Sequence, residues 1–149
     1  MTSDKAATMQ AAAEGLVMAF NGAWDEKVLE AAMASRAPEC IHAMLPKSLG
    51  LLPQNNDEWA THFRSLIGMI TESKMTIHDA VVAPEDRRVV IYSSVEATAT
   101  DGPFDNEYVW FFTFNEDGSK IVRIDEMMDS AAVRDIFERR AKAKEESKA

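Results

Sequence analysis

The second half of the chain decides the fold. Residues 75–128 read MTIHDAVVAPEDRRVVIYSSVEATATDGPFDNEYVWFFTFNEDGSKIVRIDEMM. Four runs in this stretch alternate between apolar and polar residues, the period of two that is typical of half-buried strands: 75–83, 87–100, 104–115 and 119–128. The breaks between them read Pro-Glu-Asp, Asp-Gly-Pro and Glu-Asp-Gly, which are turn sequences short enough for hairpins. The stretch therefore predicts a four-stranded antiparallel meander.

The last hairpin predicts a carboxylate within an aromatic face. A three-residue loop, Glu116-Asp117-Gly118, would place Tyr108 opposite Glu126 and Trp110 opposite Ile124. A loop shorter by one residue would turn charged side chains into the aromatic face, and burial selects against that slip. The expected inward face holds the aromatic side chains of one strand and mostly apolar side chains of the next: Tyr108, Trp110, Phe112, Phe114, Val122, Ile124, Met128 and Glu126.

A lone carboxylate among aromatic side chains requires an explanation. Burial of such a group is costly, so it needs a hydrogen-bonding partner or serves as an acid or base. Tyr108, opposite Glu126 in this register, is the natural hydrogen-bond donor to it. Alternatively, Glu126 reaches water near its strand end and has no role, and Tyr108 is a core tyrosine with a satisfied hydroxyl. The pattern alone leaves both interpretations open.

The strand over 87–100 also has two unequal faces. We assign its more apolar face to the interior: Val89, Ile91, Ser93, Val95 and Ala97. The opposite face, with Tyr92, Glu96 and Thr98, then points outward and is a candidate for a dimer contact through the sheet. We therefore expect a homodimer.

Outward from the sheet, the first third of the chain has helical spacing. One apolar stripe ends at Asn21-Gly22, and a second short stripe follows it: Met9, Ala12, Leu16 and Phe20, then Trp24, Val28, Leu29 and Ala32. Asn55 and Glu58 resemble a capping box, and the helix they open carries a third stripe: Trp59, His62, Phe63, Leu66 and Ile70. A last helix, capped by Ser130, follows the sheet. Its apolar stripe holds Val133, Ile136 and Phe137.

Residues 36–53 have no regular period and contain three of the five prolines. We expect an ordered connection there, with a brief helical turn. Helices followed by a sheet indicate an α+β fold, and 149 residues favour one domain over 1–149. Long strands curl, so we expect a cone-shaped curved antiparallel sheet, packed by the N-terminal helices around a cavity.

Composition excludes several partners. With 25 acidic and 16 basic side chains, the net charge of −9 argues against nucleic acid and against an anionic membrane surface. Cys40 is the single cysteine and cannot form an internal disulfide. The chain shows neither a leader pattern at its start nor an apolar run of membrane-spanning length. We therefore expect a cytoplasmic protein.

The motifs of several chemistries are missing. His42, His62 and His78 lack paired ligand spacing, so we expect no metal site, and no nucleotide-binding or serine-hydrolase motif predicts a cofactor or nucleophile. His62 is either a satisfied core histidine or a proton carrier facing the cavity, and His42 is equally ambiguous. Arg36 is either a surface residue or, at the cavity mouth, a partner of Glu126 or of an oxyanion.

Five segments resemble fungal SnoaL-like proteins of the nuclear-transport-factor-2-like superfamily. They span nearly the whole chain: RAPECIH (36–42), LPKSLG (45–50), NN to HF (55–63), NEYVW (106–110) and EMMDS (126–130). The resemblance implies a cone-shaped α+β barrel. It does not single out a reaction, because the scaffold hosts cyclases, isomerases, dehydratases, epoxide hydrolases and non-enzymatic binding modules.

The fungal subgroup includes cofactor-free isomerases of natural-product biosynthesis, among them semipinacolases of indole alkaloid pathways. In these an arginine, a glutamate and two tyrosines four residues apart carry the site, which implies Arg36, Glu126 and Tyr108 here. The second tyrosine falls at Phe112, which has no hydroxyl. A likeness to scytalone dehydratase fits less well, because its histidine pair has no clear match in this chain.

We therefore hypothesise a cofactor-free isomerase or cyclase that acts on a hydrophobic polycyclic natural product. Glu126 would act as acid or base, held by Arg36 and Tyr108. The expected substrate-binding residues are aromatic residues and histidines: Trp59, His62, Phe63, Trp110, Phe112 and His42. The alternatives are a non-catalytic binding or dimerisation module, or a relative that has lost its activity.

Overall fold

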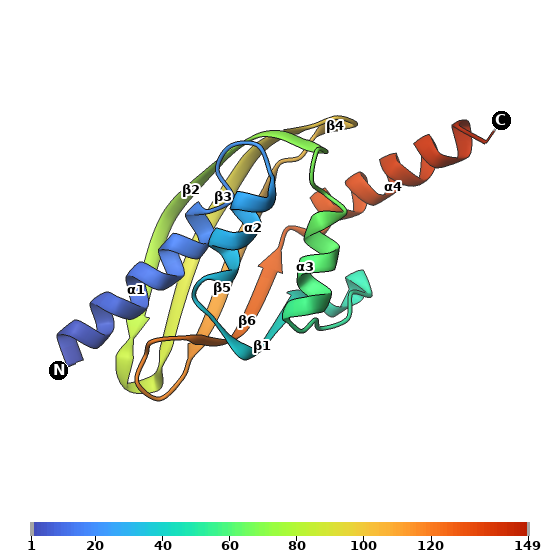
Figure 1. Cartoon of the computed structure of the whole chain (residues 1–149). Helices are drawn as coiled ribbons and strands as arrows, with labels where there is room; N and C mark the ends of the chain where they lie inside the picture. Colours follow the sequence, from blue (N-terminus) through green and yellow to red (C-terminus); the bar gives the residue numbers. More distant parts are fainter. Residues whose placement is uncertain (1, 149) are drawn as a thin grey trace.

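The computed structural model describes residues 2–148, which form four α-helices and a curled sheet (Figure 1). The helices are α1 (Thr2–Met18), α2 (Glu26–Met33), α3 (Asn56–Arg64) and α4 (Ser130–Glu146). The strands are β1 (Arg36–Leu45), β2 (Ile70–Ala83), β3 (Arg88–Ala99), β4 (Gly102–Pro103), β5 (Asn106–Phe114) and β6 (Ile121–Met128). The α+β class is confirmed, and none of the helices in residues 2–148 is long and apolar enough to cross a membrane.

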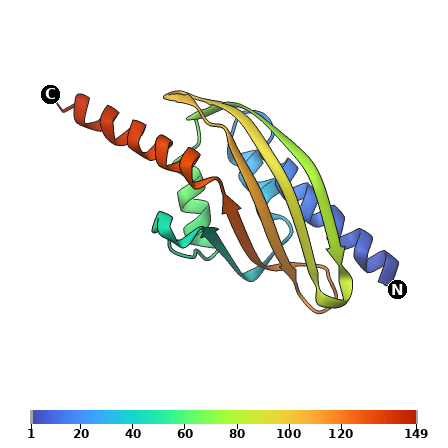
Figure 2. The same ribbon diagram turned by 180° about the vertical axis from the view of Figure 1, so that it is seen from behind.

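The sheet curves around one side of the molecule, and α1, α2 and α3 lie on its concave side (Figure 2). Its strand order is β1-β6-β5-β3-β2, with the short β4 paired to β3. Helix α1 packs on β2 and β3, and α3 packs on β1. Helix α2 contacts both α1 and α3. Helix α4 leaves the end of β6 and projects away from the body of the molecule (Figure 1). The sheet therefore forms a half-barrel closed by helices.

The expectation of an irregular connection at 36–53 was wrong for its first part. Residues 36–45 form β1, which pairs with β6 in parallel, with His42 opposite Ile124. The sheet is therefore mixed, and only its β2-β3-β5-β6 part is the predicted antiparallel meander. Pro38 hides the strand in the sequence, but an edge strand tolerates proline. The expected brief turn is present as a 3₁₀ helix over Lys47–Leu49.

The predicted register of the last hairpin was also wrong, by two residues. Tyr108 lies opposite Met128, and Trp110 lies opposite Glu126. The loop is longer than three residues, because the Asn115 N–H donates to the Lys120 carbonyl at 2.8 Å, and a bulge follows Thr113. A shift of two preserves the face of most side chains, so the prediction holds for Ile124, Glu126 and Met128. It was wrong for Val122, because the bulge places Ile121 opposite Phe114 and in the core instead.

Most of the predicted packing is confirmed. The inward residues of β3 are buried, from Val89 to Ala97, whereas Tyr92 points outward. The stripes of the first two helices enter the core, and the capping box of Asn55 and Glu58 is present. The stripe of α3 was extended too far, because the helix ends at Arg64 and Ile70 begins β2.

Candidate active site

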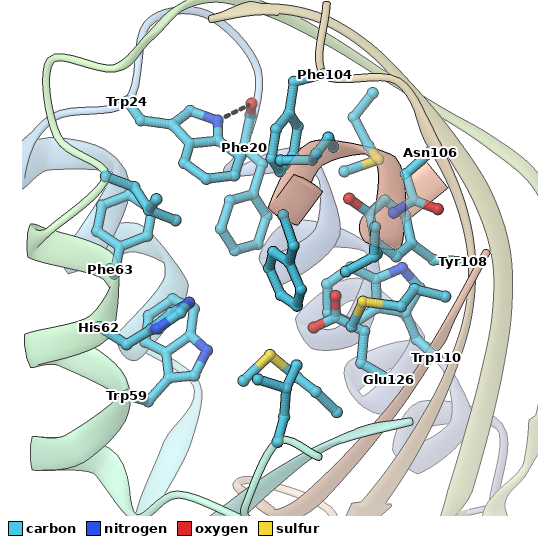
Figure 3. Close-up of a pocket in the computed structure, with 18 of the residues that line it drawn as sticks. Phe20, Trp24, Trp59, His62, Phe63, Phe104, Asn106, Tyr108, Trp110 and Glu126 are labelled. Carbon is cyan, nitrogen blue, oxygen red and sulfur yellow. Dashed lines mark hydrogen bonds between the residues drawn. The ribbon is translucent and has the colours of Figure 1, made fainter. Parts of the chain in front are cut away.

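A cavity of about 140 Å³ lies between the concave face of the sheet, α3 and the first half of α4 (Figure 3). Its walls are mostly aromatic and aliphatic, and the cavity is partly open to solvent. The side chains come from helices, strands and loops: Phe20, Trp24, Met44, Leu51, Trp59, His62, Phe63, Leu66, Met75, Phe104, Asn106, Tyr108, Trp110, Glu126, Met128, Val133, Ile136, Phe137 and Arg140. Such a concave apolar pocket with few polar groups is typical of small-molecule sites.

Glu126 is the one carboxylate among the lining residues, and it is held from behind by a buried chain of hydrogen bonds. Its Oε1 lies 2.7 Å from His42 Nε2, and His42 Nδ1 lies 3.2 Å from Arg36 Nη1. A guanidinium can only donate, so His42 Nδ1 accepts and Nε2 carries the hydrogen. Arg36 therefore donates to His42, and His42 donates to Glu126. This order fixes the tautomer of the imidazole and aims its N–H at the carboxylate.

Burial governs the charges in this chain. Removal from water lowers the pKa of His42, an effect that the neighbouring Glu126 only partly offsets, so the imidazole stays neutral. Desolvation also lowers the pKa of Arg36 to about 10, while Cys40 and Glu126 favour its charge. The guanidinium therefore remains a buried cation at neutral pH, one imidazole away from the carboxylate.

Two contacts with the Trp59 ring hold this chain of hydrogen bonds in place. The Arg36 Cζ atom lies 4.2 Å from the centroid of the Trp59 ring, and the His42 ring stacks on the same indole at 5.6 Å and 10°. Arg36 Nε also donates to the Ala32 carbonyl at 3.0 Å. Because β1 supplies both Arg36 and His42 and pairs with β6, the missed strand is the element that brings the chain to Glu126.

Tyr108 also lines the cavity, although no hydrogen bond joins it to Glu126. Within residues 2–148, its hydroxyl has no hydrogen-bond partner. Burial and the charge of Glu126 raise the pKa of Tyr108, so the phenol keeps its proton and remains a donor. Trp110, beside it on the same face, is already satisfied, because its Nε1 donates to Ser93 Oγ at 2.9 Å.

The structure divides the residues singled out by the sequence into two layers. The lining layer holds Trp59, His62, Phe63, Tyr108, Trp110 and Glu126. His62 is exposed at the rim, where partial burial lowers its pKa. Arg36 and His42 lie behind Glu126 rather than in the wall, so Arg36 reaches Glu126 only through His42.

Phe112 differs from its expected place in the pocket wall. It is fully buried, stacks on Trp110 at 6.0 Å and does not line the cavity. Its position four residues from Tyr108 therefore lies one layer deeper in the core. A hydroxyl there would face the core rather than the cavity.

Sequence reasoning did not assign several lining residues to the pocket. The apolar stripe of α4 was visible in the sequence, but nothing indicated that Val133, Ile136 and Phe137 line the cavity. Asn106 lies in the segment NEYVW that carries the family resemblance, but neither it nor Arg140 was singled out as a pocket residue. Among residues 2–148, no group of three or more His, Cys, Asp or Glu side chains is placed to hold a metal ion.

Comparison with curated proteins finds relatives from fungi. The chain is 30% identical over 110 residues to the monooxygenase AacuP of Aspergillus aculeatus, covering 74% of this chain and 76% of the relative. It is 31% identical over 114 residues to the austinoid biosynthesis cluster protein J of Aspergillus calidoustus, covering 74% and 69%. One of these relatives is named for a reaction and the other for the biosynthetic cluster that it belongs to.

Solved structures share the whole fold. The BvnE pinacolase from Penicillium brevicompactum superposes with a TM-score of 0.83 at 26% identity, covering 93% of this chain and 94% of that one. PrhC from Penicillium brasilianum has the same fold, with a TM-score of 0.82 at 22% identity and coverage of 94% and 92%. The SnoaL-like domain model matches residues 17–124, and the chain therefore belongs to the SnoaL-like family, with its nuclear-transport-factor-2-like fold.

Proposed function

We propose that the protein is a cofactor-free isomerase or cyclase that moves protons on a hydrophobic polycyclic secondary metabolite. One observation carries this proposal: a single carboxylate, Glu126, lines an aromatic pocket and is held from behind by the chain Arg36–His42–Glu126. The enzyme class also has support from relatives named as a pinacolase and as a biosynthesis cluster protein.

Glu126 is the proposed proton carrier. Oε1 accepts from His42, and within residues 2–148 no hydrogen bond is made to Oε2, which leaves lone pairs of this carboxylate for a ligand. The cation of Arg36 stabilises the negative form before the reaction, and His42 stays in place while Glu126 gains and returns a proton. Proton transfer of this kind contributes about 10²–10⁴-fold in rate.

Tyr108 is the proposed donor on the opposite side of the reacting atoms. Its raised pKa keeps the phenol protonated, so it can donate a hydrogen bond to an oxygen that gains negative charge. The apolar walls exclude water and strengthen both interactions. The base and the donor together are sufficient for an isomerisation in which the substrate and the product have the same atoms.

The size of the cavity limits how the substrate sits. A volume of about 140 Å³ is close to that of the engineered cavities that hold one aromatic ring. A polycyclic substrate would place its reacting ring beside Glu126 and extend its other rings through the part that is open to solvent. The lining residue Phe137 is itself exposed, so it would contact those outer rings.

A second candidate function follows from the relatives named as monooxygenases, AacuP among them. With the same base, proton removal from a phenol would leave an electron-rich anion that reacts with O₂. The substrate would supply two electrons, one oxygen atom would enter the product, and the other would leave as water. The two hydrogen atoms of that water come from the substrate, so the product gains one oxygen atom and loses two hydrogen atoms, whereas the first reaction leaves the mass unchanged.

The test uses an extract of the producing organism grown without the gene, where the substrate accumulates. Purified protein is added, and the products are followed by mass spectrometry under ¹⁸O₂. A new compound of unchanged mass, formed by the wild type and not by Glu126→Gln, supports the isomerase or cyclase. A product that contains one ¹⁸O atom supports the second candidate. Binding without conversion contradicts both and favours a non-catalytic module.

Two further expectations belong to this proposal. The outer face of β2 and β3 exposes large side chains, including Val81 and Tyr92, and we propose that a second copy covers it to form a homodimer. Light scattering on the purified protein tests this assembly. We also propose a cytoplasmic location, where the buried Cys40 would remain reduced, and a fluorescent fusion in the producing cells tests that location.

A further inference from the structure

Asn106 is the polar lining residue for which the proposed reaction has no use. It is the first residue of β5, lies two positions before Tyr108 on the same face, and is buried. Its side chain lines the cavity next to Tyr108 (Figure 3). A buried amide needs hydrogen-bond partners at both its oxygen and its nitrogen, so its unused atoms indicate what it can bind.

The orientation of this amide is set by the backbone. Asn106 Oδ1 accepts the N–H of Glu107 at 2.8 Å and the N–H of Asp129 at 3.0 Å. Both partners are donors, so the oxygen must face them, and the amide cannot be flipped. The –NH₂ group therefore points the other way. Within residues 2–148, Nδ2 has no hydrogen-bond partner, and it is not sealed off from the cavity by other atoms.

Asn106 and Tyr108 thus present two unpaired donors side by side. The Tyr108 hydroxyl also lacks a partner within residues 2–148, and its raised pKa keeps its hydrogen in place. Glu126, on the neighbouring strand, faces the same cavity with an acceptor. The pocket is therefore polarised, with donors at the start of β5 and the acceptor on β6. A ligand oxygen that only accepts would fit the donor side and be repelled by the carboxylate.

We propose that Asn106, together with Tyr108, binds a carbonyl oxygen of the substrate, which makes the substrate a polycyclic ketone or quinone. This inference rests on the proposed function in one respect, that the same cavity is the substrate site. A ligand without this oxygen would leave both donors unpaired in the pocket. The site therefore discriminates strongly against such a ligand. Asn106 therefore contributes specificity that the apolar walls do not provide.

The test compares two rings of nearly equal shape, 1-tetralone and tetralin, which differ by one carbonyl group. Asn106→Asp keeps the oxygen that caps Glu107 and Asp129, and replaces the inward –NH₂ with an oxygen. Asn115→Asp, in the loop between β5 and β6, is the matched control for the same change of amide to acid. Dissociation constants for both rings are measured by calorimetry and by quenching of the pocket tryptophans.

We expect the preference for tetralone over tetralin to fall about tenfold or more in Asn106→Asp, while the dissociation constant for tetralin stays the same. In Asn115→Asp, both dissociation constants should equal those of the wild type. The inference would be overturned by an unchanged preference in Asn106→Asp or by an equal loss of affinity for both ligands. It would also be overturned if the wild type bound neither ligand. Because no turnover is measured, this result is independent of whether Glu126 carries a proton.

A second measurement covers the case in which Asn106→Asp does not fold. The infrared C=O stretch of bound tetralone is recorded in the wild type and in Tyr108→Phe, which keeps Asn106. We expect a lower frequency than in hexane in both proteins, with a smaller shift in Tyr108→Phe. A frequency equal to that in hexane in Tyr108→Phe would leave Asn106 without a role.

Discussion

The two faces of the sheet each carry a tyrosine and a glutamate, and they use them differently. On the outer face, the Tyr92 hydroxyl donates to Glu107 Oε2 at 2.6 Å, and both side chains are exposed. On the inner face, Tyr108 is 8% exposed and Glu126 13%, and no hydrogen bond joins them. The two members of the outer pair are hydrogen-bonded to each other, whereas the Tyr108 hydroxyl and Glu126 Oε2 remain available for a ligand.

The candidate site is therefore defined by the surroundings of these side chains and not by their residue types. At the exposed Tyr92, the hydrogen bond to Glu107 and the charge of that carboxylate raise the pKa. At Tyr108, burial is the main cause of the raised pKa. The inner carboxylate, Glu126, is also supported by the buried side chains of His42 and Arg36, and the outer carboxylate, Glu107, has no such support.

The largest effect on stability is expected when the support of Glu126 is removed. Arg36→Met keeps the packing on Trp59 but leaves His42 Nδ1 and the Ala32 carbonyl without their donor. Breaking a buried charged network costs about 3–5 kcal/mol. Chemical denaturation should show this loss, together with weaker turnover. Arg123→Met, whose exposed guanidinium pairs with Asp125, should stay within about 0.5 kcal/mol of the wild type.

The next effect is expected on the donor of the inner pair. Tyr108→Phe removes the hydroxyl that faces the ligand and should lower kcat about tenfold, the equivalent of about 1–1.5 kcal/mol in transition-state stabilisation. Tyr92→Phe removes the outer hydroxyl and should leave kcat unchanged. Steady-state kinetics on the substrate isolated from the extract measures both. Equal effects at the two tyrosines would remove the distinction between the faces.

A smaller effect concerns pH. Burial lowers the pKa of His42 in the folded protein below that of the unfolded chain, so the unfolded state binds the extra proton first. Stability is therefore complete above the ordinary pKa of histidine, about 6.5, and falls as the pH drops below it, by at most about 1.4 kcal/mol per pH unit. Denaturation at pH 5, 6 and 7 should show this slope. His42→Gln should reduce it, and an unchanged slope in this variant would contradict the role given to burial of His42.

The smallest effect is expected where α4 lines the cavity. Arg139 and Arg140 bind Asp101 at 3.2 and 2.8 Å and tie α4 to the turn after β3. Although burial opposes the charge of Asp101, the hydrogen bond from Arg140 and the charges of both arginines hold its pKa below the usual value. Asp101→Asn should cost about 0.5–1 kcal/mol at most, because the pairs are partly exposed. Hydrogen exchange should quicken in α4 and remain unchanged in β5.

Much of the fold followed from periodicity. The alternation of β3 and β5 and the stripe that contains Leu16 and Phe20 depend on local spacing, which a single sequence displays. Strand β1 could not be predicted, because its pairing with β6 joins residues more than 80 positions apart and Pro38 interrupts its pattern. The register of the last hairpin failed because its loop and bulge depend on hydrogen bonds made after folding, such as that between Asn115 and Lys120.

Most residues of the candidate site could be predicted from the sequence, but the hydrogen bonds that connect them could not. Glu126 and Tyr108 stood out because polar groups on an apolar face are unusual. The place of His42 between Arg36 and Glu126 depends on the unpredicted strand, and the role of Asn106 depends on where its oxygen is held. These features are tertiary, so they become visible only when distant segments are placed together.

One comparison tests the central claim most directly, the turnover of Glu126→Gln against that of Glu107→Gln. Both variants replace a carboxylate with an amide on the same sheet, one facing the cavity and one facing solvent. We predict that Glu126→Gln loses about 10²–10⁴-fold in kcat while it still folds and binds tetralone, and that Glu107→Gln keeps the wild-type kcat. Equal turnover of the two variants would contradict the assignment of Glu126 as the proton carrier.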